Sequence, residues 1–148
     1  MASRQEVPGP VPGKMKGPET SRPRLMPFGV VAVAVVFFFV AVATDIFWLG
    51  RLAFGAFPST MPVPEPVERA FVGPDVLLSV LLYIAAYGLL KLRRYGFMAA
   101  YVGMGMWMFD TLLVLGITRL TYLAFLGPGL VFVIFAVVYL WTRKDLFC

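Results

Sequence analysis

Residues 120–142 read LTYLAFLGPGLVFVIFAVVYLWT, a run of 23 residues without a charged side chain. A helix of about 20 such residues spans the roughly 30 Å hydrocarbon core of a bilayer. Three further segments share this character: residues 25–44 carry no charge, and residues 70–90 and 95–118 carry one aspartate each. The pattern predicts an all-α integral membrane protein, a bundle of four transmembrane helices at about 26–49, 70–90, 95–118 and 121–141.

The composition of the whole chain supports the same fold class. Of its 148 residues, 60% are hydrophobic and 14% are charged, whereas about 25% of the residues of a soluble domain are charged. The chain has no histidine, and Cys148 is its single cysteine. Sites that need histidine ligands, histidine bases or an intrachain disulfide are therefore excluded. We expect no cofactor, no metal and no nucleic-acid partner.

Residues 1–24 differ from the rest of the chain. They hold five prolines and three glycines, and their charges sum to +3. Such a segment is predicted to be an extended or disordered cytoplasmic tail, with residues 25–148 forming the membrane domain. Its basic side chains suit anionic lipid headgroups. The apolar run that follows could instead belong to a secretory signal, but its length favours a retained membrane helix.

Lysine and arginine are distributed unevenly between the two ends of the predicted helices. The tail contributes five, the turn at 91–94 three and residues 143–144 two, whereas the opposite side has only Arg51, Arg69 and Arg119. Because cytoplasmic loops are richer in these residues, both termini are predicted to be cytoplasmic, in a cell (plasma) membrane protein. Trp48 is expected to lie at the outer interface as an anchor. The loop at 51–69 is rich in proline and is expected to be extended and irregular.

The chain also contains two similar pairs of segments. Residues 71–75 read FVGPD and residues 125–129 read FLGPG, each at the start of a predicted helix. Upstream, Asp45 and Asp110 each precede a Leu-Gly pair and then an Arg-Leu pair. The match favours two tandem parallel αα-hairpin repeats. Chance is the alternative, because these residue types are common in membrane helices.

The depth of each acidic residue follows from the rise of a helix. Asp75 lies 16 residues before Lys91, and Asp110 lies 16 residues after Arg94. At 1.5 Å per residue, both carboxylates lie roughly 24 Å from the cytoplasmic edge, level with each other and near the outer surface. Asp45 is expected at that surface itself. We therefore expect Asp75 and Asp110 to approach each other across neighbouring antiparallel helices.

Each aspartate has a structural interpretation beside the functional one. Asp75 follows a proline at a helix start, where an acid complements the helix dipole. Asp45 could pair with Arg51 or stay solvated. Asp110 lies within its span, where an acid is costly and by default indicates a functional site. Arg119 or Arg51 is expected to reach the two aspartates as a counter-charge.

Three other features complete the candidate residues. Ser79 and Tyr83 fall on the helical stripe of Asp75 and are candidate further ligands. A stripe of small residues is expected to allow close helix packing; it consists of Gly96, Ala99 and Gly103. Pro128 is expected to kink the last helix, because it removes one backbone hydrogen bond.

These observations leave the function open between two main classes. The shortage of polar groups favours a non-catalytic membrane protein, a structural or accessory subunit that packs against other membrane subunits or against itself. The alternative is a small proton- or cation-linked transporter or channel that uses Asp75 and Asp110. An enzyme acting on lipids is less favoured, since only the acids support it.

Overall fold

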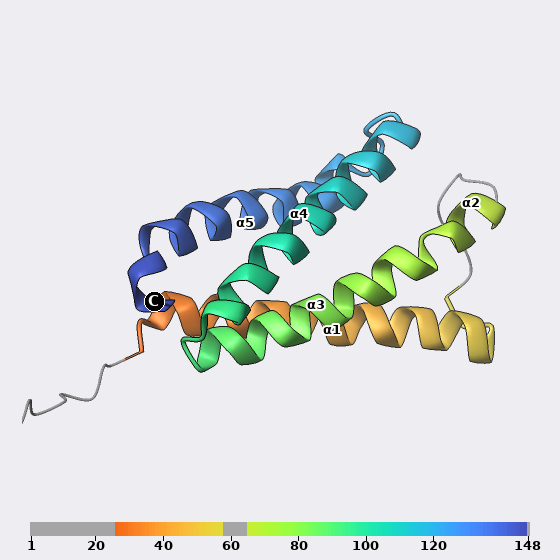
Figure 1. Ribbon diagram of the computed structural model, residues 1–148. Helices are drawn as coiled ribbons and strands as arrows, with labels where there is room; N and C mark the ends of the chain where they lie inside the picture. The colour runs from red at the N-terminus through yellow and green to blue at the C-terminus, as the bar shows by residue number, and fades with distance from the viewer. Residues whose placement is uncertain (1–25, 58–64, 148) are drawn as a thin grey trace, which may run out of the picture.

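The computed structural model describes residues 26–57 and 65–147, and within these ranges it contains helices and no strand. The elements are α1 (Phe28–Phe54), α2 (Glu65–Ala70), α3 (Val72–Leu90), α4 (Arg94–Ile117), α5 (Leu123–Thr142) and the short 3₁₀ helix η1 (Lys144–Phe147) (Figure 1). Four stretches are long and apolar enough to cross a membrane: α1, α2 with α3, α4, and α5. This supports a transmembrane protein. The predicted tail lies outside the described residues.

The helix boundaries differ from the prediction mainly around the loop. The first helix continues to Phe54 instead of ending near residue 49. Gly55 ends it by adopting a left-handed conformation with φ of 62°, and the Ala56 N–H then donates to the Gly50 carbonyl at 3.0 Å. Residues 65–70 also form a helix, because Pro66 near a helix start costs no backbone bond. The expectation of an irregular loop over 51–69 is therefore wrong at both ends.

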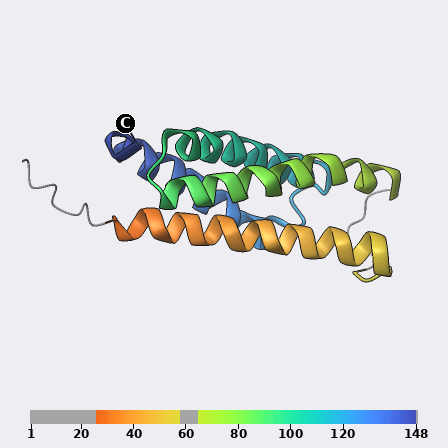
Figure 2. The same cartoon turned by 60° about the horizontal axis from the view of Figure 1, so that its bottom comes forward.

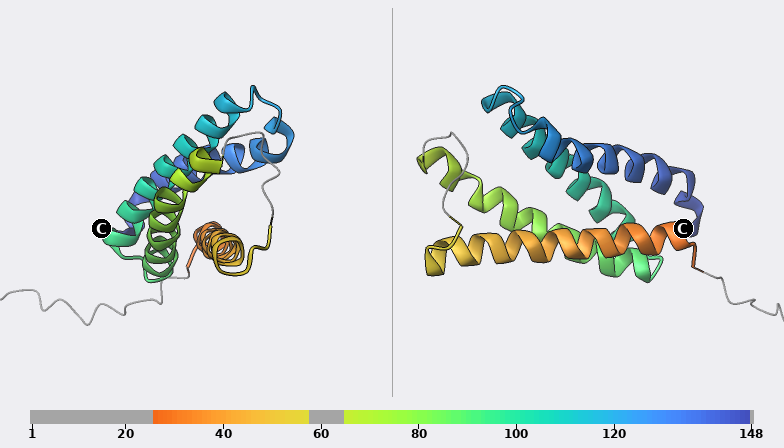
Figure 3. Two further views of the ribbon diagram at one scale, coloured as in Figure 1. Left: turned by 90° about the vertical axis from the view of Figure 1, so that its right-hand side faces the viewer. Right: turned by 180° about the vertical axis from the view of Figure 1, so that it is seen from behind.

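The helices form two pairs that are joined by the packing of α3 on α4. Helix α1 runs antiparallel to α3, and α5 lies along α4 (Figures 1 and 2). At the end that contains residues 91–93, the start of α1 and η1, the four helices meet; we call this the closed end. At the opposite end, which contains α2 and residues 118–122, the helices diverge: α1 moves away from α4 and α5, and α3 runs between them (Figure 3). We call this the splayed end.

Glycines allow the close approach of α3 and α4 near the closed end. A Cβ added to Gly96 would collide with the backbone of Gly88, and one added to Gly88 would collide with Gly96. Further along α4, Gly103 faces the side chain of Leu82, and Ala99 is buried between these two positions. Small residues on one stripe of α4 therefore lie where α3 packs, as helix association in lipid requires.

Large side chains fill the bundle between the closed end and its middle. The fully buried residues include Phe37, Leu82, Leu89, Met104, Val133 and Leu140. Helix η1 returns the chain toward this core, where the Phe147 ring lies 5.3 Å from the ring of Phe97. Pro128 is the sixth residue of α5 and deprives one carbonyl of its helical partner. The kink at Pro128 stays a prediction.

Candidate functional site

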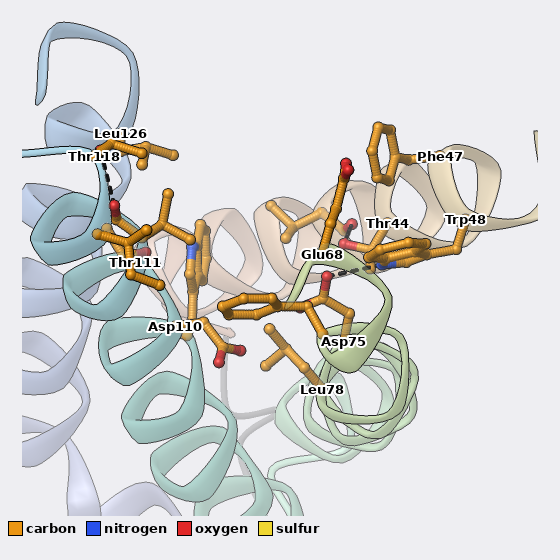
Figure 4. A pocket seen from close by; sticks show the side chains of 15 residues that line it. Thr44, Phe47, Trp48, Glu68, Asp75, Leu78, Asp110, Thr111, Thr118 and Leu126 are labelled. Atoms are coloured by element: carbon orange, nitrogen blue, oxygen red, sulfur yellow. Dashed lines mark hydrogen bonds between the residues drawn. The ribbon is translucent and has the colours of Figure 1, made fainter. Parts of the chain in front are cut away.

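A cavity of about 200 Å³ lies between the diverging helices (Figure 4). Residues from α1, α2, α3, α4 and α5 line it. Its polar lining residues are Thr44, Glu68, Asp75, Asp110, Thr111 and Thr118. Its aromatic lining residues are Phe47, Trp48, Phe71 and Trp107, and aliphatic side chains complete the wall. The cavity is thus mostly apolar with two aspartates on facing helices.

Helical periodicity explains how α4 contributes so many of these residues. Each of these residues lies three or four positions from another of them, so they share one face: Trp107, Asp110, Thr111, Val114 and Thr118. The same spacing places Val40, Thr44 and Phe47 on one face of α1. The two faces lie on opposite sides of the cavity, because the helices diverge here and leave space between them.

Asp75 is held in place by a tryptophan from α1. The Trp48 Nε1–H donates a hydrogen bond of 2.7 Å to Asp75 Oδ2 (Figure 4). Trp48 is only 4% exposed, so its expected role as an interfacial anchor is wrong. Its indole is buried because the carboxylate satisfies its single N–H donor. Asp75 therefore lines the cavity in a fixed orientation.

Asp110 lines the same cavity without such support. Its Oδ2 is buried and has no hydrogen-bond partner, and no other buried side-chain nitrogen or oxygen in the described ranges lacks one. Figure 4 shows the Asp110 and Asp75 side chains extending into the space between α4 and α3. An acid in an apolar site is costly when nothing compensates its charge. Asp110 is therefore the residue of this cavity that most needs a partner.

The expected arginine counter-charge does not reach either aspartate. Arg51 instead donates to Glu68 at 2.6 Å and to the Phe57 carbonyl at 3.0 Å. Arg119 follows α4 in the turn at the splayed end and does not line the cavity. The predicted ion pair between Arg51 and an aspartate of the cavity does not form, because Glu68 lies nearer to Arg51 and pairs with it.

Like Arg51 and Arg119, three further predicted site residues lie outside the cavity lining. The Tyr83 hydroxyl donates to Asp45 Oδ2 at 2.8 Å, which links α3 to α1. Asp45 thus pairs with a tyrosine, not with Arg51. The Ser79 hydroxyl donates to the Val76 carbonyl at 3.0 Å inside its own helix. The helical stripe that Asp75 shares with Ser79 and Tyr83 was too broad to predict which of them are ligands. Asp75 lines the cavity, whereas the Tyr83 hydroxyl bonds to Asp45 of α1.

Glu68 and Trp107 are cavity residues that the sequence analysis did not single out. Glu68 was assigned to an irregular loop, but on helix α2 it becomes a buried partner of Arg51. A signal was present, because Glu65 and Arg69 have the spacing of an ion pair on a helix and do form one at 2.7 Å. Trp107 lies three residues before Asp110, and that spacing alone places both on one face.

The cavity offers few free ligands for a metal ion. No group of three or more histidine, cysteine, aspartate or glutamate side chains that could hold a metal occurs in the part of the chain that the structure describes. The Thr44 and Thr118 hydroxyls donate to the carbonyls of Val40 and Val114, at 2.9 and 2.8 Å. Their oxygens can still accept a hydrogen bond from a ligand.

Comparison of the chain with protein-family models, with curated proteins and with solved structures found no match. The cavity and its two aspartates are therefore the features of the chain that point to a function.

Proposed function

We propose that the protein is a small proton- or cation-linked transporter of the cell membrane, which binds its ion at Asp110 and Asp75. The observation that carries the proposal is the buried Asp110 oxygen without a partner. In a low-dielectric site, an ionised carboxylate needs a cation or several hydrogen-bond donors, and a neutral one needs a proton. A carboxylate whose charge is compensated only by what binds to it is suited to carry a proton or a cation.

The proposed orientation places the cavity toward the outside of the cell and both termini in the cytoplasm. Its support is the distribution of charge. Lys91, Arg93 and Arg94 lie at the closed end, as do Arg143 and Lys144, and the basic tail precedes the start of α1 there. By the positive-inside rule the closed end is cytoplasmic. The tail would then meet anionic headgroups of the inner leaflet.

The two helix pairs would be the units that move. The α1–α3 and α4–α5 pairs are the two proposed tandem repeats; α1 has little contact with α5, whereas α3 packs along α4 and joins the two pairs. Between the cavity and the closed end lies the buried core around Phe37, Leu82 and Met104. Transport therefore requires the α4–α5 pair to shift against the α1–α3 pair, with Pro128 as a site at which α5 can bend.

The test uses purified protein in liposomes that contain a pH-sensitive dye and are acidic inside. Chloride salts of sodium, potassium or tetramethylammonium are added outside, and in a second arm an inside-negative potential drives protons inward. We expect proton movement in one arm at a rate several-fold above that of protein-free liposomes. Asp110→Asn should abolish it, and the matched change Asp145→Asn, at an exposed acid of η1, should preserve it. No movement above protein-free liposomes in either arm would refute the proposal.

The second candidate is the accessory subunit. Helix α5 supports it, because α5 is the least buried of the four candidate spans and presents Phe125, Val131 and Phe135 at 60–81% exposure. Such a face suits lipid, a partner subunit or a second copy. Extraction in mild detergent separates the candidates: a stoichiometric partner or a defined oligomer supports this role, and a free monomer speaks against it.

A further inference from the structure

We infer that the ligand of the cavity is a small organic ammonium, a positively charged nitrogen attached to an apolar body, and not a bare metal ion. The inference rests on the proposed function in one respect, that the cavity at the splayed end is the cation site. The class of cation follows from the walls, the oxygen atoms and the size of the cavity.

The walls offer aromatic faces close to the charged group. Trp107 lies one helical turn from Asp110 on the same face of α4, and both line the cavity. Helix α5 fixes the indole: it lies 3.5 Å from the position of a Cβ at Gly129, and its ring centroid is 6.1 Å from that of Phe132. A carboxylate beside an aromatic face is the arrangement that attracts an ammonium, by charge and by cation–π interaction.

The oxygen atoms are too few and too occupied for a dehydrated metal ion. Calcium takes six to eight oxygen ligands, and magnesium requires octahedral geometry. Here one Asp75 oxygen accepts the Trp48 N–H, and Glu68 is bound to Arg51. An ammonium has at most three N–H donors to satisfy. Asp110, the remaining oxygen of Asp75 and the hydroxyl oxygen of Thr111 are enough for it.

The volume limits the size of the apolar body. The cavity of about 200 Å³ is smaller than the roughly 300–1,000 Å³ of pockets for drug-sized ligands. A single ring or a short alkyl chain fits such a space. The same ammonium chemistry occurs in free amines and in the ethanolamine headgroup of a lipid, so the experiment has an arm for each source.

The experiment is isothermal titration calorimetry on the full-length protein in detergent micelles, with 2-phenylethylammonium chloride as the probe. We expect saturable binding at least tenfold tighter than that of 2-phenylethanol, which has the same body without the charge. Asp110→Asn should reduce the preference for the charged probe to less than threefold, whereas Asp145→Asn should leave it unchanged. Sodium and magnesium chloride should give no saturable heat.

Two further arms make the outcome decisive. In nanodiscs of phosphatidylglycerol, added phosphatidylethanolamine should compete with the probe if the headgroup is the source, and should not compete if a free amine is. Equal binding of the alcohol and the ammonium, or saturable binding of sodium or magnesium alone, would overturn the inference. Probe binding that depends on Asp110 but without proton movement in liposomes would retain the ammonium class and refute proton movement coupled to sodium, potassium or tetramethylammonium or driven by the membrane potential. Proton movement without probe binding would retain transport and refute the ammonium class.

Discussion

Two aspartates at the same predicted depth have different surroundings, and that difference is the basis of the proposed site. Asp75 accepts the Trp48 N–H, whereas the buried oxygen of Asp110 accepts nothing. A donor from the protein stabilises the first carboxylate in place. The second depends on a ligand, because a buried polar group without a partner costs about 1–3 kcal/mol, and more when it is charged.

Substitution of Asp110 separates a binding role from a structural one. If the side chain serves ligand binding, Asp110→Asn and Asp110→Leu should both abolish ion movement and leave the unfolding temperature in detergent unchanged or higher. The reason is that each variant removes a carboxylate that no group of the protein compensates. No hydrogen bond to Asp110 Oδ2 is lost, because this oxygen has none. The measurement is thermal unfolding of both variants beside the liposome assay. A marked loss of stability with leucine alone would assign Asp110 a structural hydrogen bond instead.

Counting residues along the helices was informative about which aspartates share a cavity and poor at assigning partners. Helical rise and the short turn at 91–93 predict that Asp75 and Asp110 lie level on neighbouring helices, and both line one cavity. Partners depend on how each helix is rotated about its axis. That rotation is set by packing that no single stripe reveals, and for this reason Trp48 and Tyr83 were assigned to the wrong surroundings.

At the scale of elements, the packing of α3 on α4 is the contact that brings the two aspartates to one cavity. Its closest point is the backbone contact of Gly88 with Gly96. Composition and length were sufficient to predict the four long helices, because an apolar run of about 20 residues has few alternatives in a bilayer. They did not predict α2, since six residues that include Pro66 carry too weak a periodic signal.

Enlarging Gly96 tests this contact. Gly96→Leu should separate α3 from α4 and lower the free energy of unfolding by about 2 kcal/mol or more, because neither backbone can yield at this point. Gly105→Leu is the matched control on the same helix, where an added Cβ meets nothing within 4 Å. The measurement is thermal or denaturant unfolding in detergent. Equal stability of the two variants would contradict the packing described for α3 and α4.

At the scale of the whole molecule, one end of the bundle is filled and the other holds a cavity. Side chains such as Leu89, Leu140 and Phe147 close the end that carries the basic turn. The divergence of the helices leaves space at the other end (Figure 3). The proposed transporter, with its site toward the outside, needs this arrangement of a cavity at one end and a filled core at the other.

The most direct test of this account is the reactivity of a cysteine placed in the cavity of the protein in intact cells. Thr111 lines the cavity and is 6% exposed, and Cys148 is the single native cysteine, so Thr111→Cys is combined with Cys148→Ser. The rates of modification by a cationic and an anionic methanethiosulfonate added outside are compared after correction for their rates with a free thiol. We predict modification from outside, at least tenfold faster for the cationic reagent, and a smaller ratio when Asp110→Asn is added. Modification only after permeabilisation, or equal corrected rates for the two reagents, would contradict a cation site that faces the outside.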